Sequence, residues 1–299
     1  MHCILIGYGY WGKIIKKYID SSSKFELIEI YDHHLSNSVS LESLLKNNDI
    51  EVAFVCVPVD AHYKVVKMLL EYHIHVFCEK PLCKSKIDVE NLYDVAKKNG
   101  CILFTDYIYT VSPSILEMKK YIRNFGRILY IEMSIRQFGK FYATDHVFDV
   151  IGVHMMSALI FLLDTNLGDI KVDFVNVIKK GKNGLPDVGT VYLNLPDEIK
   201  CKIECSLVSA EKERKIQVLC EKGIVIFDML GERTIRAISY SEEKGTRVIY
   251  ENKHDESNNL VYMLENFYHT IMTKDTKNED ITRQTSLVSE RINKWIAEN

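Results

Sequence analysis

A chain of 299 residues is long enough for one large domain or two ordinary ones, and either would bury a sizeable core. An apolar content of 47% and a charged content of 26% are typical of a globular protein and exclude a disordered or fibrous one. The formal net charge of −3 gives no electrostatic reason to expect nucleic acid as a partner, and the apolar stretches are too short or too interrupted to span a membrane.

The first apolar run leads directly into a glycine-rich turn. Residues 3–6 predict a buried strand, residues 7–12 form the turn Gly-Tyr-Gly-Tyr-Trp-Gly, and apolar residues at helical spacing across 14–19 predict an amphipathic helix. No basic segment or cleavage site precedes this strand, so we expect no signal peptide and a cytoplasmic location. The turn is G-x-G-x-x-G between a strand and a helix, the context that dinucleotide-binding domains require.

Each residue type in this turn has a physical reason. Gly7 permits the tight turn, Gly9 lets a pyrophosphate approach the backbone, and Gly12 lets the helix pack on the strand. The helix N-terminus then faces the phosphates. Tyr10 and Trp11 lie inside the turn, which favours contact with the cofactor, although exposed aromatic side chains are an equal interpretation.

An acid follows at the distance that a nucleotide-binding domain needs. The second predicted strand, 25–31, ends in Asp32, about twenty residues beyond the turn. A carboxylate at this place accepts hydrogen bonds from both ribose hydroxyls and repels a 2′-phosphate. We therefore expect NAD as the cofactor in preference to NADP.

Strands and helices continue to alternate to residue 105, which predicts a parallel sheet. The expected elements are a helix near 40–46, a strand at 52–57, a helix around 65–70, a strand at 74–78, a helix at 87–98 and a strand at 101–105. The strand 74–78 ends in Glu79-Lys80-Pro81, at the carboxyl edge where open α/β sheets bind ligands. Pro81 restricts Lys80 to extended backbone, so the chain directs the ammonium towards a bound substrate. A solvated lysine at a strand end is the alternative.

The second half has a different pattern. Expected elements are a helix at 114–124, a strand at 128–135, a strongly apolar helix at 146–163, strands near 190–195, 200–207, 215–220 and 223–227, and terminal helices at 260–272 and 281–296. Alternating apolar and polar residues in these strands favour an antiparallel sheet with one solvated face. We expect residues 1–108 and 109–299 to form two domains.

The cysteines and the central histidine have ordinary structural interpretations. None of the eight cysteines forms a C-x-x-C pair, and the spacing of Cys201 and Cys205 is not that of a zinc knuckle, so we expect reduced core thiols and no metal. His154 lies inside the apolar helix, where a lone histidine is more often a core residue than a catalyst.

Several motifs together resemble the Gfo/Idh/MocA family of NAD(P)-dependent sugar oxidoreductases. They are Ile50 to Pro58, His62-Tyr63, His75-Val76, Glu79 to Leu82, and a glycine turn that is similar to the G-Y-G-Y-W-G variant of members associated with surface-glycan biosynthesis. The resemblance implies an N-terminal Rossmann domain and a C-terminal α+β domain on an open, mainly antiparallel sheet. Members often dimerise through that sheet, so a homo-oligomer, either a dimer or a tetramer, is expected.

The resemblance also implies roles for individual residues. Lys80 would lie beside the nicotinamide and the reacting carbon. Gly152-Val153-His154 with Ser157 is similar to the family's D-x-G-x-H helix, whose histidine abstracts or returns the hydroxyl proton, a task that suits an imidazole near neutral pH. Further implied contacts are Val57, Pro58, His62 and Glu79 with the cofactor, and Arg136 and Tyr142 with the substrate. For His62 a helix-capping role is the alternative, and for Arg136 and Tyr142 a solvated loop.

One position departs from the family pattern. The family's aspartate falls four residues before the histidine, where this chain has Val150, whereas Asp149 stands five residues before it. In a regular helix Asp149 lies about 140° around the axis from His154, and Val150 about 40°. A π-bulge, which adds one residue to a turn, would restore the catalytic pair. Otherwise Asp149 is a solvent, capping or oligomer-contact residue.

These expectations combine into an NAD-dependent oxidoreductase that transfers a hydride between nicotinamide and a carbinol or keto carbon of a sugar or nucleotide-linked sugar. Two alternatives remain. A reductase of a non-sugar substrate, like biliverdin reductase, shares this architecture, but the intact Lys80 argues against it. The absence of an acid at Val150 leaves open an NAD-binding regulatory protein that has lost catalysis.

Overall fold

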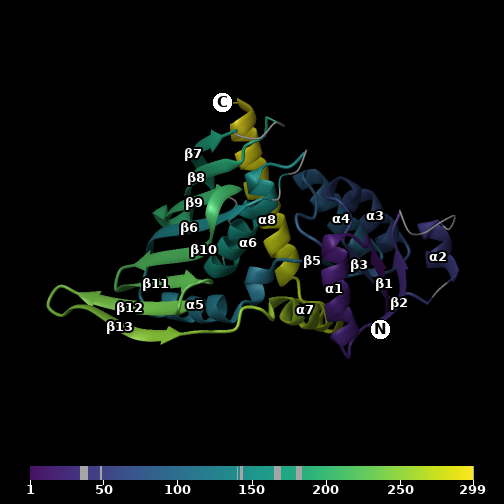
Figure 1. The fold of residues 1–299 in the computed structure, drawn as a ribbon, viewed down its shortest axis with the longest axis horizontal. Coiled ribbons are helices and arrows are strands. Elements are labelled where there is room, and N and C mark those ends of the chain that lie inside the picture. Colours follow the sequence, from purple (N-terminus) through teal and green to yellow (C-terminus); the bar gives the residue numbers. More distant parts are fainter. Residues whose placement is uncertain are drawn as a thin grey trace. The chain divides into compact units, whose positions relative to one another are not determined.

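The chain divides into two compact units. The computed structural model describes residues 1–33, 40–47, 49–139, 141, 144–164, 170–179 and 184–298. One unit is Met1–Ile108 with Asn258–Ser286, and the other is Tyr109–Ser257 with Leu287–Asn299 (Figure 1). A simple division after residue 108 is therefore incomplete, because a later segment returns to the first unit.

The first unit is built on a five-stranded parallel sheet in the order β2-β1-β3-β4-β5. Its strands are β1 (His2–Ile6), β2 (Glu26–Tyr31), β3 (Val52–Val55), β4 (His75–Cys78) and β5 (Leu103–Thr105), and its helices include α1 (Tyr10–Ser21), α2 (Leu41–Asn47), α3 (Val59–Glu71) and α4 (Lys86–Lys98). The strand order reverses beside β1, so the carboxyl ends of β1 and β3 form the crevice where such sheets bind ligands. The predicted parallel Rossmann sheet is confirmed.

An aromatic cluster explains why α7 (Asn259–Thr273) belongs to this unit. Phe54, Phe77 and Phe104 stand side by side in register across β3, β4 and β5. The ring of Phe267 on α7 packs on all three, with centroid distances of 6.0, 5.5 and 5.4 Å. Phe267 is fully buried, so a helix far along the chain completes one face of the sheet. The opposite face packs against the apolar sides of α3 and α4.

The last helix, α8 (Lys277–Glu298), holds the edge of this sheet. The Asn278 side chain accepts a hydrogen bond from Thr105 N at 2.8 Å and donates one to Thr105 O at 2.9 Å. These contacts satisfy backbone groups of β5 that a neighbouring strand would otherwise pair. The N-terminal part of α8 therefore stabilises the parallel sheet, while residues from Leu287 onward belong to the second unit.

The second unit is an eight-stranded, mainly antiparallel sheet in the order β13-β12-β11-β10-β6-β9-β8-β7, as expected. Its strands are β6 (Ile128–Phe138), β7 (Lys171–Ile178), β8 (Val188–Asn194), β9 (Lys200–Ser206), β10 (Val208–Cys220), β11 (Gly223–Asp228), β12 (Ile235–Ser241) and β13 (Gly245–Asn252). Of the strand pairs described in this sheet, only β6 and β9 run parallel. Helix α5 (Pro113–Asn124) packs on β11 and β12, and α6 (Val153–Leu163) packs on β6, so these helices cover one face (Figure 1).

Sequence patterns missed β7, β12 and β13. Almost every residue of β13 is exposed, so no apolar alternation marks it.

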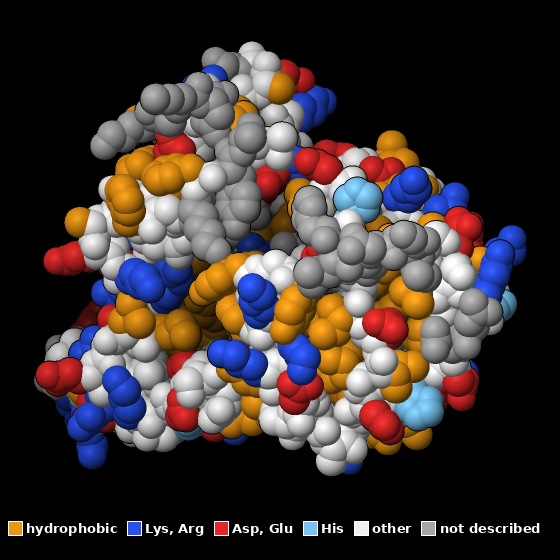
Figure 2. Space-filling model, turned by 45° about the vertical axis from the view of Figure 1, so that its right-hand side comes forward, with side chains coloured by type: hydrophobic (Ala, Val, Ile, Leu, Met, Phe, Trp, Pro, Cys, Tyr) orange, Lys and Arg blue, Asp and Glu red, His pale blue; other side chains and the backbone are white. Residues whose placement is uncertain are grey.

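The eight cysteines are free thiols, and Cys201 and Cys205 are buried. Positive and negative side chains are interspersed over the face drawn in Figure 2. Within the described ranges, no helix combines the length and apolar character that crossing a bilayer requires.

Candidate active site

The glycines of the turn in the first unit have two different surroundings: two of them are closely packed, and one borders open space. A Cβ on Gly12 would lie 2.0 Å from Gly7 O, and a Cβ on Gly7, whose φ is +91°, would lie 2.8 Å from the backbone of Cys56. A Cβ on Gly9 would meet nothing within 4 Å. Gly7 and Gly12 are therefore needed for the close approach of strand, turn and helix, whereas Gly9 borders open space at the N-terminus of α1, where a pyrophosphate fits.

Asp32 follows β2 directly and lies beside the glycine turn. Its Oδ2 accepts a hydrogen bond of 2.6 Å from Tyr8 N, inside the glycine turn. The carboxylate is therefore fixed beside the turn and adds negative charge at the place where a ribose would bind. Tyr10 and Trp11 are 61% and 42% exposed and form an edge-to-face pair with centroids 5.5 Å apart. Together these residues fit a dinucleotide cofactor.

Glu79 and Lys80 follow β4 directly. Glu79 N donates to Val55 O at 3.0 Å, which continues the parallel ladder, and the Lys80-Pro81 peptide bond is cis. Lys80 is half-buried at the carboxyl edge of the sheet, as expected.

His62 is buried between two loops of the first unit. Its ring is 1% exposed. Nδ1 lies 3.0 Å from Pro81 O and 3.2 Å from Leu82 O, and Nε2 lies 2.9 Å from Val57 O. Both ring nitrogens are thus engaged by backbone carbonyls, and the imidazole connects the loop after β3 to the loop that carries Lys80. Burial lowers the pKa of His62. The ring therefore braces these two loops, and the cofactor contact of His62 stays a prediction.

Two buried carboxyl groups lie at the same edge of the sheet. Glu79 is 8% exposed and Asp106, which follows β5, is 3% exposed. Burial raises the pKa of Glu79 to about 6, although the charge of Lys80 opposes this rise. Burial, reinforced by Glu79, raises the pKa of Asp106 well above its usual value. Asp106 was missed from the sequence, yet the rule that singled out Lys80, a polar residue at the end of a buried parallel strand, applies to it equally.

In the second unit, a π-helical turn precedes α6. The turn covers Phe148–Gly152, and Val153 N donates to Phe148 O, five residues back. Residues five apart therefore share a face here, and Asp149 and His154 are five apart. The π-turn that the sequence required for this pairing is present. Asp149 Oδ2 lies 3.2 Å from His146 Nε2, which in turn lies 2.6 Å from Asn293 Oδ1.

Tyr109 packs against His154 and was not anticipated. The two rings meet edge to face with centroids 5.5 Å apart. Burial raises the pKa of the Tyr109 hydroxyl to about 12, against the opposing effect of Arg214, which also hydrogen-bonds to it. The Ser157 hydroxyl donates to His154 O at 3.0 Å, a bond within the helix. The Tyr109 ring thus packs against the imidazole, while Ser157 binds the backbone of the same residue.

The expected substrate contact of Arg136 is not supported by its place in β6. The buried residues Met133 and Ile135 face α6, and Arg136 points to the opposite face of the sheet. There it forms ion pairs with Glu204 at 2.6 Å and Glu213 at 3.5 Å. Arg214, opposite Ile135 in the ladder, lies on the same face as α6. Tyr142, the other expected substrate contact, lies outside the described residues.

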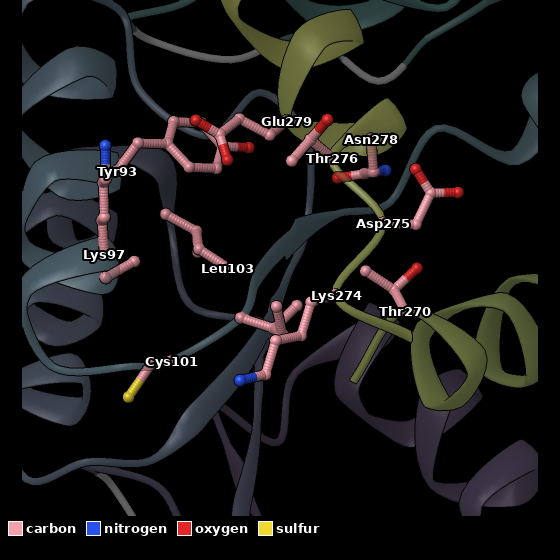
Figure 3. Close-up of a pocket in the computed structure, with 12 residues that line it drawn as sticks. Tyr93, Lys97, Cys101, Leu103, Thr270, Lys274, Asp275, Thr276, Asn278 and Glu279 are labelled. Atoms are coloured by element: carbon pink, nitrogen blue, oxygen red, sulfur yellow. The ribbon is translucent and has the colours of Figure 1, made fainter. Parts of the chain in front are cut away.

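A cavity of about 290 Å³ in the first unit is distinct from this site (Figure 3). It lies between α4, the amino end of β5 and the connection of α7 to α8, at the end of the strand opposite Asp106. Lys97 and Lys274 line it together with Asp275 and Glu279. Charges of both signs balance, so the cavity shows no preference for a charged ligand.

Comparison with known proteins identifies the family. Residues 1–107 match the profile "Oxidoreductase family, NAD-binding Rossmann fold", and residues 115–226 match the "GFO/IDH/MocA C-terminal domain". Myo-inositol 2-dehydrogenase of Thermotoga maritima is 21% identical over 217 residues, which are 69% of this chain and 65% of that enzyme. The match therefore spans slightly less than two thirds of the relative's length.

Two solved structures share the fold over nearly the whole chain. UDP-N-acetylglucosamine 3-dehydrogenase GnnA from Acidithiobacillus ferrooxidans has a TM-score of 0.83 at 17% identity, covering 99% of this chain and 97% of that one. GenD2 from gentamicin A biosynthesis, in complex with NAD, has a TM-score of 0.85 at 14% identity, covering 99% and 94%. The two profile matches, over residues 1–107 and 115–226, show that the chain belongs to the Gfo/Idh/MocA family of oxidoreductases.

Proposed function

We propose that this protein is an NAD-dependent dehydrogenase or reductase that transfers a hydride between nicotinamide and a carbinol or keto carbon of a sugar, including nucleotide-linked sugars. The observation that carries the proposal is the joint presence, in a chain of this family, of the open glycine turn with Asp32 and of Lys80 at the same edge of the sheet. The related proteins named above act, by their names, on inositol and on UDP-N-acetylglucosamine, which supports a polyol or sugar as the substrate.

The chain's own residues would divide the work as follows. Asp32 binds the ribose hydroxyls and disfavours a 2′-phosphate, so NAD is preferred over NADP. Lys80 donates a hydrogen bond to the substrate oxygen and stabilises the negative charge that develops on it. His154 accepts or returns the hydroxyl proton, and Asp149 orients its imidazole. The bound cofactor supplies the hydride acceptor or donor.

The regulatory alternative rested on a missing acid. The π-turn at Phe148–Gly152 supports the catalytic proposal instead, because it gives Asp149 the helix face that the residue at Val150 would occupy in a regular helix. We also propose a homo-oligomer, which sedimentation of the purified chain at several concentrations would test. A monomer throughout would contradict this part alone.

The deciding experiment measures NADH formation with a panel of sugars, inositols and nucleotide sugars. The expected result is turnover with at least one of them, loss of turnover in Lys80→Ala, and retained NADH binding in that variant. Lys84→Ala is a matched control, because this lysine, four residues later, forms an ion pair with Asp60 at 2.9 Å. Tight NADH binding without turnover on any substrate would favour the regulatory alternative.

A further inference from the structure

The carboxyl groups of Glu79 and Asp106 follow two neighbouring parallel strands, β4 and β5, and both are more than nine-tenths buried. Asp106 N donates to Cys78 O at 2.9 Å, so the backbone fixes Asp106 beside the Glu79-Lys80 segment. Among the residues that the structure describes, neither Glu79 Oε1 nor Asp106 Oδ1 has a hydrogen-bond partner. A buried carboxylate oxygen without a partner is costly, so this arrangement calls for a reason.

The charges around the pair suggest that reason. The charge of Lys80 acts on both carboxyl groups, and the charge of Glu79 raises the pKa of Asp106. The other titratable groups that face them are the Cys56 and Cys78 thiols, whose pKa values burial raises strongly, so that both stay neutral. His62 lies on α3, and burial lowers its pKa, as does the positive charge of Lys80.

Two ionised carboxylates and one ammonium would leave a net charge of −1 in a buried place. If the two carboxyl groups hold one proton between them, the cluster of Glu79, Lys80 and Asp106 is neutral. Two carboxyl groups that share a site lose their protons in two steps at different pH, because the first negative charge opposes the second. The shared proton also supplies a donor for one of the unpartnered oxygens.

We propose that Asp106 and Glu79 form a carboxyl pair that shares one proton and acts as a positioning device for Lys80, holding its ammonium charged and directed at the substrate oxygen. This inference rests on the proposed function for the role of Lys80, but its physical content concerns the protein without substrate or cofactor. Loss of the shared proton releases it to solvent and leaves the cluster with one negative charge in excess.

Stability against pH distinguishes this role from ordinary packing. A pKa of about 6 in place of 4.5 means that ionising Glu79 weakens the folded state about thirtyfold. Because the folded-state pKa is raised, the stability is fully present below pH 4.5 and is lost as the pH rises through about 6, and the raised pKa of Asp106 extends the loss to higher pH. Above the pH at which the pair loses its shared proton, the wild type has two negative charges at this place and Asp106→Asn has one, so the stability of the variant should exceed that of the wild type increasingly as the pH rises.

The charge of Lys80 can be measured directly. The modification of lysines by an amine-acylating reagent, followed between pH 7 and 11 by mass spectrometry of the peptide that contains Lys80, yields the midpoint at which this amine loses its proton. Once the shared proton is lost at high pH, the wild-type pair carries two negative charges and Asp106→Asn carries one, so the variant should lower that midpoint by about one pH unit. The matched control is Asp94→Asn, at an exposed position on α4, which should leave both the midpoint and the stability curve unchanged.

An unchanged Lys80 midpoint in Asp106→Asn overturns the proposal, whatever the stability shows. A wild-type stability that does not fall between pH 5 and 8.5, relative to Asp106→Asn, overturns the shared proton. If both measurements agree with expectation while no sugar supports turnover, the proposed function fails and the carboxyl pair stands. With a working substrate, Asp106→Asn should also shift the alkaline limb of kcat/KM downward and leave NADH affinity unchanged.

Discussion

The glycine turn allows fold and cofactor binding to be tested separately. In Gly12→Ala the new methyl group would lie 2.0 Å from Gly7 O, whereas real Cβ atoms essentially never come within 3.0 Å of such a neighbour. The backbone of the turn must therefore move by at least 1.0 Å, the difference between these two distances. Backbone cannot rotate aside as a side chain can, so we expect a loss of about 3 kcal/mol, the upper end for overpacking.

Gly9→Ala is the matched control in the same turn. Its φ of −74° suits alanine, and the added methyl group meets nothing within 4 Å. Its stability should remain within about 0.5 kcal/mol of the wild type. The methyl group would instead occupy the space where a pyrophosphate approaches the backbone, so NADH affinity should fall at least about tenfold, or 1.4 kcal/mol.

The assay combines urea unfolding without cofactor and NADH titration by fluorescence. Gly12→Ala should unfold at a clearly lower urea concentration than the wild type, and Gly9→Ala should unfold as the wild type does but bind NADH weakly. If Gly12→Ala is as stable as the wild type, the close approach of Gly7 and Gly12 is not as described. If Gly9→Ala binds NADH with wild-type affinity, the cofactor does not approach the turn at this glycine.

Three further predictions concern other elements. Phe267→Ala should cost about 3–5 kcal/mol in urea unfolding, because a fully buried ring at the centre of the aromatic cluster is lost, while Tyr268→Ala next to it should cost much less. Asn278→Ala should lower the free energy of unfolding by about 2 kcal/mol, since it leaves both backbone groups of Thr105 without their partner. Hydrogen exchange at β5 should rise, and unchanged exchange would contradict the role of Asn278 at the edge of the sheet. Asp149→Asn should lower kcat at least about a hundredfold on any substrate found, with NADH affinity kept, whereas activity near that of the wild type would remove Asp149 from the mechanism.

Local sequence patterns predicted the elements that bury apolar runs. The strands of the first unit and the glycine turn were expected at nearly their observed bounds, because a parallel sheet buried on both faces gives uninterrupted apolar segments. Strand β13 carries no such pattern, since its side chains are exposed, and only pairing with β12 defines it.

Contacts between distant residues were beyond these patterns. The sequence marks α7 as an apolar helix, but not that Phe267 completes the parallel sheet more than a hundred residues earlier in the chain. Arg136 and Arg214 lie on opposite faces of the sheet, because Arg214 pairs with Ile135 and successive residues of a strand point to opposite faces. No pattern near Arg136 showed which face its guanidinium would take. For His62, the loops that its nitrogens contact become neighbours only in the folded sheet.

The π-turn bears on how this chain is compared with its relatives. If Val150 is omitted, residues 149 to 154 spell Asp-Ile-Gly-Val-His, and the acid stands four places before the histidine. One inserted residue thus describes the difference from the D-x-G-x-H pattern as well as a replaced acid does, and the π-turn favours the insertion. Alignment columns that forbid a gap inside a helix would score the acid as lost. Grouping by which side chains share a helix face would keep it among those that retain the acid.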